Sequence, residues 1–337
     1  MANHDDSMED IRRTIEELKA LNEKDGVDFS EEISRLEAKL SALDEADGDD
    51  TQPEVETNPD WETVKLARHP KRPSTADYLN RVADDYFELR GDRMYADDRA
   101  LLTALARFGE RTVVVIGHQK GHTAEENQTR NFGMPHPEGY RKAQRAMRLA
   151  ERFGFPVLSL IDTPGAYPGI GAEERNIGGA LATSIYEMFK LQVPIVVTVL
   201  GEGGSGGALG IGVGDRVLMM QNAIYSVISP EGCAAIIWRD RAKAPEAARA
   251  LKLTAEHLSD FGVIDEIVAE PEGGAHQDPD DAAESLKSIL CRHLQELEGM
   301  STEARHQARR DRFQAIGRYE ELSEAVEAAS RGGVDSR

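Results

Sequence analysis

Cysteine is almost absent from this sequence, and so is any long apolar run. The chain has 337 residues and only two cysteines, Cys233 and Cys291. Two cysteines are too few for a zinc site of the usual four-ligand kind and predict two reduced thiols. No apolar run reaches the roughly 18–20 residues that span a bilayer, and the acidic N-terminus has no signal core. We therefore predict a cytoplasmic protein without a membrane segment.

Basic residues are outnumbered by acidic ones, 40 against 61. The net charge is −21, and most of the acidic excess lies in the first 60 residues. Such a charge disfavours nucleic acid as a partner. Because the excess is concentrated near the N-terminus, it says little about a site elsewhere in the chain.

The first 60 residues are predicted to form an acidic helical hairpin and a linker. Apolar residues recur at spacings of three and four from Ile11 to Leu43, and Asp25-Gly26 interrupts them. The stretch Glu45–Pro59 is acidic and poor in apolar residues, which is typical of a flexible linker.

The rest of the chain is predicted to be an α/β domain. The prolines in Leu66–Pro73 favour an extended segment, and a helix is expected over Thr75–Leu89. Farther along, strands and helices alternate, which predicts a largely parallel sheet with crossover helices. The expected strands are Leu101–Arg107, Thr112–His118, Val157–Asp162, Ile195–Leu200, Val217–Ser229 and Ile264–Ala269. The expected helices are Pro137–Phe153, Ile177–Leu191, Gly207–Val213, Gly232–Trp238, 280–298 and 302–328.

The stretch Val193–Gly214 carries the strongest functional signal. A β-branched run leads into a glycine-rich segment, Gly201–Gly207, and small apolar residues that can begin a helix follow. A strand that enters a helix through glycines leaves backbone N–H groups unpaired and pointing one way. This arrangement predicts a site that stabilises an anion.

Two known motifs fit the glycines only partly. The dinucleotide pattern at Gly201, Gly203 and Gly206 lacks the acidic residue expected about 20 positions later. The pattern Gly203-x-Ser205-x-Gly207 matches the nucleophile elbow of serine hydrolases, with Ser205 as nucleophile. His257, His276 and His293 follow it in the chain. A hydrolase therefore stays an alternative, as does a scaffold without catalytic activity.

A third interpretation needs no side chain. Adjacent N–H groups at Gly206 and Gly207 would form an oxyanion hole for an enolate or a tetrahedral intermediate. A second glycine loop, which begins at Asp162-Thr163-Pro164, follows the preceding strand. Since consecutive parallel strands end at the same edge, both loops should line one pocket.

Basic and polar residues elsewhere give weaker signals. Within Arg130–Arg152 a cluster of bases forms one helix face, which is either solvated or a contact for an acidic ligand or partner. The candidates for such a contact are Arg130, Arg141, Lys142 and Arg145. Polar residues near a strand end, His118, Gln119, Lys120 and His122, are more often structural.

Seven segments together resemble one family, the α subunit of bacterial acetyl-CoA carboxylase carboxyltransferase, over residues 60–300. They are Leu66–Pro73, Gly91–Asp98, Ile116–Lys120, Arg130–Lys142, Ile161–Arg175, Gly201–Ala208 and Ser226–Ala234. The sequence departs from the family where a helix starts after AEER, at Asn176-Ile177-Gly178-Gly179. This departure puts polar contacts from that helix in doubt.

The resemblance implies a crotonase-like fold of stacked ββα units, preceded by the helical hairpin. It implies three parts: residues 1–60, a carboxyltransferase domain over 61–300, and a C-terminal helix and tail over 301–337. It also implies an α2β2 complex with a zinc-carrying β subunit, a biotin carboxyl carrier protein and biotin carboxylase. This chain itself is expected to hold no metal or cofactor.

The implied reaction moves a carboxyl group from carboxybiotin to acetyl-CoA and gives malonyl-CoA for fatty-acid synthesis. By the matching residues, Gly206 and Gly207 would form the oxyanion hole. The pocket for substrate or biotin would be lined by Gly165, Ala166, Tyr167, Pro168, Gly169, Gly203, Gly204 and Ser205.

Overall fold

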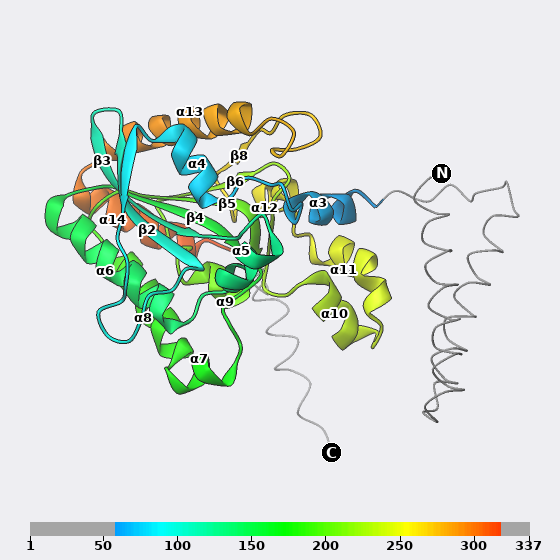
Figure 1. The fold of residues 1–337 in the computed structure, drawn as a ribbon. Coiled ribbons are helices and arrows are strands. Elements are labelled where there is room, and N and C mark those ends of the chain that lie inside the picture. The colour runs from blue at the N-terminus through cyan, green and yellow to red at the C-terminus, as the bar shows by residue number, and fades with distance from the viewer. Residues whose placement is uncertain (1–57, 318–337) are drawn as a thin grey trace, which may run out of the picture. The chain divides into compact units, whose positions relative to one another are not determined.

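The computed structural model describes residues 58–317. The predicted hairpin, nearly all of the predicted linker and the end of the helix expected over 302–328 lie outside these residues. Figure 1 shows the described chain as a sheet with helices on both faces.

One eight-stranded sheet forms the centre of the molecule, in the order β1-β2-β3-β4-β5-β6-β8, with β7 paired to β5. The first three strands are antiparallel and the pairings from β3 onward are parallel. The strands are β1 Asp85–Glu88, β2 Leu101–Phe108, β3 Arg111–His118, β4 Val157–Thr163, β5 Ile195–Gly204, β6 Arg216–Met220, β7 Ile224–Ser226 and β8 Glu266–Val268.

Helices cover both faces of this sheet. Helices α6 and α8 pack together on one face, and α4 and α13 pack together on the other (Figure 1). The helices are α3 Pro59–Ala67, α4 Thr75–Val82, α5 Ala124–Thr129, α6 Pro137–Phe153, α7 Ile170–Glu174, α8 Ile177–Lys190, α9 Ser205–Leu209, α10 Pro230–Ile237, α11 Ala244–Leu251, α12 Ala255–Asp260, α13 Pro279–Glu298 and α14 Thr302–Gln314. Two short 3-10 helices are η1 Asn131–Gly133 and η2 Arg241–Lys243.

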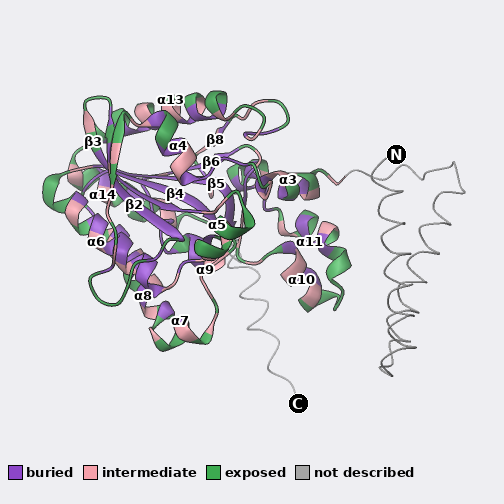
Figure 2. Ribbon diagram, in the orientation of Figure 1, coloured by how far each residue is buried: buried purple, intermediate pink, exposed green. Residues whose placement is uncertain are grey.

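The central strands are buried on both faces, as Figure 2 shows by their purple colour. Every residue of β4 is buried, and β5 is buried over all but its last residue. Their β-branched and aliphatic side chains suit strands that are covered on both faces. For this reason the apolar runs in the sequence predicted these strands. Strands β4 and β5 therefore run through the hydrophobic core nearly to their ends.

Four predicted elements need correction. The helix expected over Thr75–Leu89 ends at Val82, because the next residues form β1 and pair with β2. The long strand expected over Val217–Ser229 is two strands, β6 and β7. Part of the segment expected to be extended or linker is helix α3, which Asn58 caps through its side chain. In β5 the strand continues through the glycines to Gly204, because that segment pairs with β7.

Helix α14 is tied to the sheet by one buried ion pair. The Arg309 guanidinium donates to both carboxylate oxygens of Asp215 at 2.8 Å, and both side chains are buried. Arg309 also donates to three carbonyl oxygens, those of Met188, Leu191 and Val193. The start of the predicted C-terminal helix and tail, residues 301–337, is thus packed against the rest of the domain.

Candidate active site

The carboxyl ends of β4 and β5 bring the two glycine loops together. Thr163 pairs with Gly203 across the parallel ladder. A β-carbon built at Gly204 would lie 2.2 Å from the Pro164 carbonyl oxygen, and one at Gly207 would lie 2.3 Å from the Ala166 nitrogen. Only glycine permits such close backbone approach at these two positions. The expectation that the two loops share one edge of the sheet is confirmed.

The first residues of α9 form one wall of a cavity of about 420 Å³. The structure brings seven of the predicted pocket and oxyanion-hole residues to this wall: Gly165, Ala166, Tyr167, Pro168, Ser205, Gly206 and Gly207. The other three, Gly169, Gly203 and Gly204, lie next to these residues in the chain but do not line the cavity. Val227 and Ser229, from the loop after β7, complete the opposite side.

Ser205 stands where the strand turns into the helix. Its φ of 52° lies in the left-handed region, as expected of a sharp turn between a strand and a helix. A second cavity of about 330 Å³, mainly apolar, lies on its other side and is shared with Leu209, Tyr225 and Phe313. Among the described residues that line either cavity there is no histidine. The linings of these two cavities therefore offer Ser205 no imidazole base.

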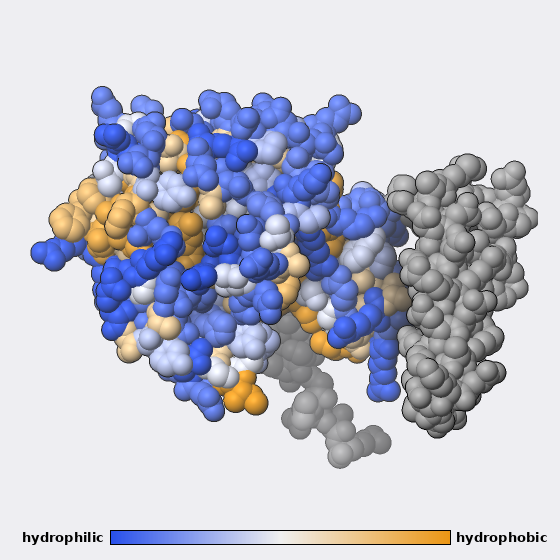
Figure 3. All heavy atoms as spheres, in the orientation of Figure 1, coloured by the Kyte–Doolittle hydropathy of each residue, from blue (hydrophilic) through white to orange (hydrophobic). Residues whose placement is uncertain are grey.

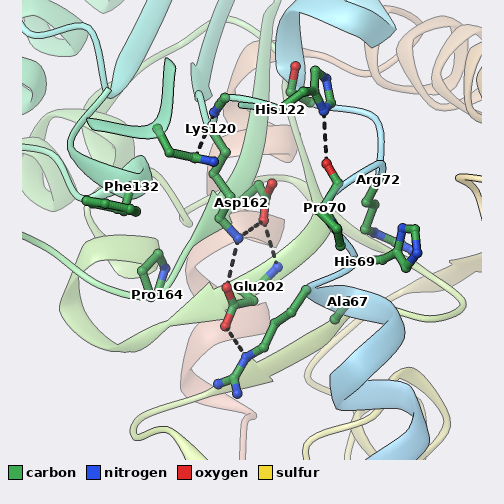
Figure 4. Close-up of a pocket in the computed structure, with 14 residues that line it drawn as sticks. Ala67, His69, Pro70, Arg72, Lys120, His122, Phe132, Asp162, Pro164 and Glu202 are labelled. Atoms are coloured by element: carbon green, nitrogen blue, oxygen red, sulfur yellow. Dashed lines mark hydrogen bonds and ion pairs between the residues drawn. The ribbon is translucent and has the colours of Figure 1, made fainter. Parts of the chain in front are cut away.

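Behind the two loops lies a buried charge network that sequence reasoning did not assemble. The Lys120 ammonium, at the end of β3, donates to Asp162 Oδ1 and to Glu202 Oε2, both at 2.8 Å (Figure 4). Asp162 Oδ1 also accepts the backbone N–H of Glu202 at 3.0 Å. Arg68 then donates to Glu202 at 2.7 Å and to Glu231 at 2.6 Å. One lysine thus joins the ends of three strands.

This pairing keeps the groups charged. Burial disfavours the charged form of Lys120, but the adjacent carboxylates outweigh it and raise the pKa of the ammonium. Burial likewise opposes ionisation of Glu202, and the charges of Lys120 and Arg68 reverse that effect, so its pKa is lowered. The signals in the sequence were Lys120 just after one strand, and Asp162 and Glu202 near the ends of two others.

The network lines a further cavity of about 320 Å³ on the side of the loops away from α9. Pro164 lines both this cavity and the one at α9. Figure 4 shows Phe132 and Pro164 on one side of it, facing His69 and Pro70 on the other. Phe132 has a φ of 54°, a rare conformation for an aromatic residue.

The other polar residues at the end of β3 have separate surroundings. His118 is fully buried, and neither ring nitrogen forms a hydrogen bond of normal geometry with any residue in the range 58–317. Burial lowers the pKa of its imidazole to about 3, with the Lys120 charge acting in the same direction. Gln119 binds the start of α4, donating to Ser74 and accepting from the Ala76 N–H. His122 contacts Asp77 at 2.7 Å.

The basic face of α6 finds its acidic partners within the chain. Arg141 donates to Asp92 and to Glu138, and the buried Lys142 ammonium lies 2.7 Å from Asp97. Arg145 donates to the carbonyls of two residues in the loop that precedes β2, those of Arg90 and Gly91. Arg130, at the end of α5, contacts only the Arg99 carbonyl at 3.3 Å. All four predicted contact residues therefore bind the loop over 90–99.

Two features are absent from residues 58–317. No group of three or more histidine, cysteine, aspartate or glutamate side chains is placed to hold a metal ion. No helix in this range combines the length and apolarity needed to cross a membrane.

The sequence is similar to one family over nearly its whole length. The family described as acetyl co-enzyme A carboxylase carboxyltransferase-like matches residues 1–317. The acetyl-coenzyme A carboxylase carboxyl transferase subunit alpha of Thermus thermophilus is 56% identical over 261 residues, 77% of this chain and 84% of that protein. Its counterpart from Xanthomonas campestris pv. campestris is 55% identical over 260 residues, 77% of this chain and 82% of that protein.

Solved structures of carboxyltransferases have a similar fold. Transcarboxylase 12S superposes with a TM-score of 0.54 and 23% identity, covering 70% of this chain and 44% of that one. The β subunit of P. aeruginosa geranyl-CoA carboxylase gives a TM-score of 0.54 at 17% identity, covering 72% of this chain and 46% of that one. This chain thus spans less than half the length of these solved chains.

Proposed function

This chain belongs to the family of acetyl-CoA carboxylase carboxyltransferase α subunits, and from that membership we propose that it supplies one wall of a shared carboxyltransferase active site. Its fold is the crotonase-like fold of biotin-dependent carboxyltransferases. The proposed substrates are acetyl-CoA and carboxybiotin on a carrier protein. A carboxyl group leaves the biotin nitrogen and forms a carbon–carbon bond with the acetyl methyl carbon, giving malonyl-CoA for fatty-acid synthesis.

In the proposed mechanism the backbone N–H groups of α9 stabilise the negative charge of the reacting oxygen. The N–H groups of Gly206 and Gly207 hold a negatively charged oxygen, either the enolate of acetyl-CoA or the ureido oxygen of biotin. The methyl proton passes to the biotin nitrogen that gives up the carboxyl group. The observation that carries this proposal is the contact of Gly207 with the Gly165–Ala166 backbone, since it fixes both glycines at the cavity wall.

The chain is proposed to work with partners. We infer a β subunit that carries the zinc and completes the site in an α2β2 assembly, with a biotin carboxyl carrier protein and biotin carboxylase in the same cytoplasmic system. Exposed apolar side chains lie close to the cavity, among them Ile170 of α7, Val227, and Ile236 and Ile237 of α10. Figure 3 shows apolar atoms at α7 and at α10, and a larger apolar group at the left of the same face. Such apolar surface beside a half-built site suits a subunit interface.

The domain division proposed from the family resemblance is retained. Residues 61–300 form the carboxyltransferase domain, residues 1–60 an acidic helical hairpin and linker, and residues 301–337 a C-terminal helix and tail. The hydrolase alternative is not favoured, because relatives and fold are those of carboxyltransferases and no histidine of the described residues lines the cavities beside Ser205.

A pair of variants at Gly206 tests the proposed backbone site. A β-carbon at this position would lie 3.6 Å from Leu181 Cδ1, an ordinary contact, so Gly206→Ala keeps both the space and the N–H group. Gly206→Pro removes the N–H group at the second position of α9, within the first turn, where proline is tolerated. Loss of one oxyanion-hole donor lowers kcat by roughly 10²–10³-fold in known cases.

The assay is carboxyl transfer between malonyl-CoA and free biotin, with the full chain purified together with its β partner. We expect activity close to wild type for Gly206→Ala and for Ser205→Ala, and a kcat at least about 100-fold lower for Gly206→Pro. Equal activity of Gly206→Pro and Gly206→Ala, with both proteins folded by circular dichroism, would remove Gly206 from the site. Hydrolytic activity of the chain without its β partner, abolished by Ser205→Ala, would instead favour the hydrolase.

A further inference from the structure

Helix α9 is too short to hold its own orientation. It comprises five residues, Ser205–Leu209, so its intrahelical hydrogen bonds are few and most of its carbonyl groups need partners elsewhere. The direction of the Gly206 and Gly207 N–H groups must therefore be set by contacts from other elements.

Three buried hydroxyl groups supply those contacts. The Tyr140 hydroxyl, from α6, donates to the Gly207 carbonyl at 3.0 Å. The Ser184 hydroxyl, from α8, donates to the Gly210 carbonyl, and the Ser159 hydroxyl, from β4, donates to the Ile211 carbonyl. All three side chains are 0% exposed. Three different elements thus bind three carbonyls, one within α9 at Gly207, one at its C-cap Gly210 and one just after it at Ile211.

Packing adds to this hold at one point. A β-carbon at Gly210 would lie 2.5 Å from Tyr140 Cε1, so the tyrosine ring lies flush against the end of α9. Gly207 is thereby fixed twice, through its carbonyl by Tyr140 and through its α-carbon by the Gly165–Ala166 backbone.

We propose that Tyr140, Ser159 and Ser184 are positioning residues: their hydroxyls hold α9 so that the N–H groups of Gly206 and Gly207 face the cavity. This inference rests on the proposed function, in which those two N–H groups stabilise an oxyanion. A displacement of about 1 Å at a reacting centre can cost as much as 100-fold in rate, so small losses of alignment are measurable.

The chain offers matched controls for removing a buried hydroxyl. Tyr78 and Thr198 are also 0% exposed, and neither hydroxyl has a hydrogen-bond partner among residues 58–317. Tyr78→Phe is therefore the control for Tyr140→Phe. Thr198→Val is the control for Ser159→Ala and Ser184→Ala.

All five variants are assayed as full-length chains in complex with the β partner. We expect Tyr140→Phe, Ser159→Ala and Ser184→Ala to lower kcat by about 10-fold while KM for malonyl-CoA stays within about twofold, because alignment and not binding is lost. Amide hydrogen exchange of a peptide over residues 201–213 should be faster in these three variants. Both controls should match wild type in kcat and in exchange.

Two results would overturn the proposal. One is a set of hydroxyl variants that match their controls in both kcat and exchange. The other is faster exchange with an unchanged kcat, since the hydroxyls would then stabilise α9 without aligning the site. A wild-type complex without carboxyl-transfer activity would refute the proposed function instead, and the exchange data would still decide whether the hydroxyls hold α9.

Discussion

Lys120 and Glu202 are joined by a 2.8 Å ion pair that lies behind both glycine loops and links the end of β3 to the end of β5. The same ammonium binds Asp162, at the end of β4. This one side chain therefore links the ends of three neighbouring strands.

Removing that ammonium should destabilise the protein strongly. Lys120→Met leaves the buried carboxylates of Asp162 and Glu202 without their shared cation, and breaking a buried pair costs about 3–5 kcal/mol. The free energy of unfolding, from urea denaturation, measures this loss. The control is Lys65→Met, whose partner Glu62 lies in an exposed pair and which should change stability very little. A Lys120→Met protein as stable as wild type would show that the network holds nothing in place.

The ion pair between Arg309 and Asp215 should be equally important for α14. Arg309→Met would leave Asp215 and several buried carbonyls without a donor, at a cost of about 3–5 kcal/mol. Arg310→Met, one residue along the same helix and exposed, is the matched control. If both variants melt at the same temperature, α14 contributes little to the stability of this body.

Hydrophobic patterning predicted the sheet but not its ends. Buried strands such as β4 and β5 follow from apolar runs, and so do the crossover helices. The strand β1 could not be predicted, because Tyr86 and Phe87 pair with β2 across residues distant in sequence, and that pairing overrides the helical pattern.

The sequence predicted the parts of the candidate site that the backbone forms. It did not predict the parts that depend on contacts between side chains. Glycines marked the two loops, since close backbone approach leaves few other residues possible. The basic face of α6 predicted an external ligand or a solvated surface, because sequence gives charge but not distance. The aspartates that Arg141 and Lys142 bind became evident only in three dimensions.

Only glycine should be tolerated at position 207, whereas alanine should also be tolerated at position 206. A β-carbon at Gly207 would collide with the Ala166 nitrogen at 2.3 Å, and Gly207 itself is buried, so it has little room to move away. Overpacking of this kind costs about 1–3 kcal/mol. We expect Gly207→Ala to lower the melting temperature and Gly206→Ala to leave it within error, as measured by differential scanning calorimetry. The reverse order would mean that the loop over 164–166 yields more readily than its packing indicates.

Acid should weaken the fold through His118. Its folded pKa is about 3 and its unfolded pKa is about 6.5, so below pH 6.5 the unfolded chain binds a proton that the folded chain does not. Stability therefore falls as pH drops from 6.5, by up to about 1.4 kcal/mol per pH unit. His118→Gln removes this proton uptake, so the difference in unfolding free energy between wild type and variant should shift in favour of the variant between pH 7.5 and pH 5. Urea denaturation at each pH measures that difference, and a difference independent of pH would place the imidazole in contact with water or an acid.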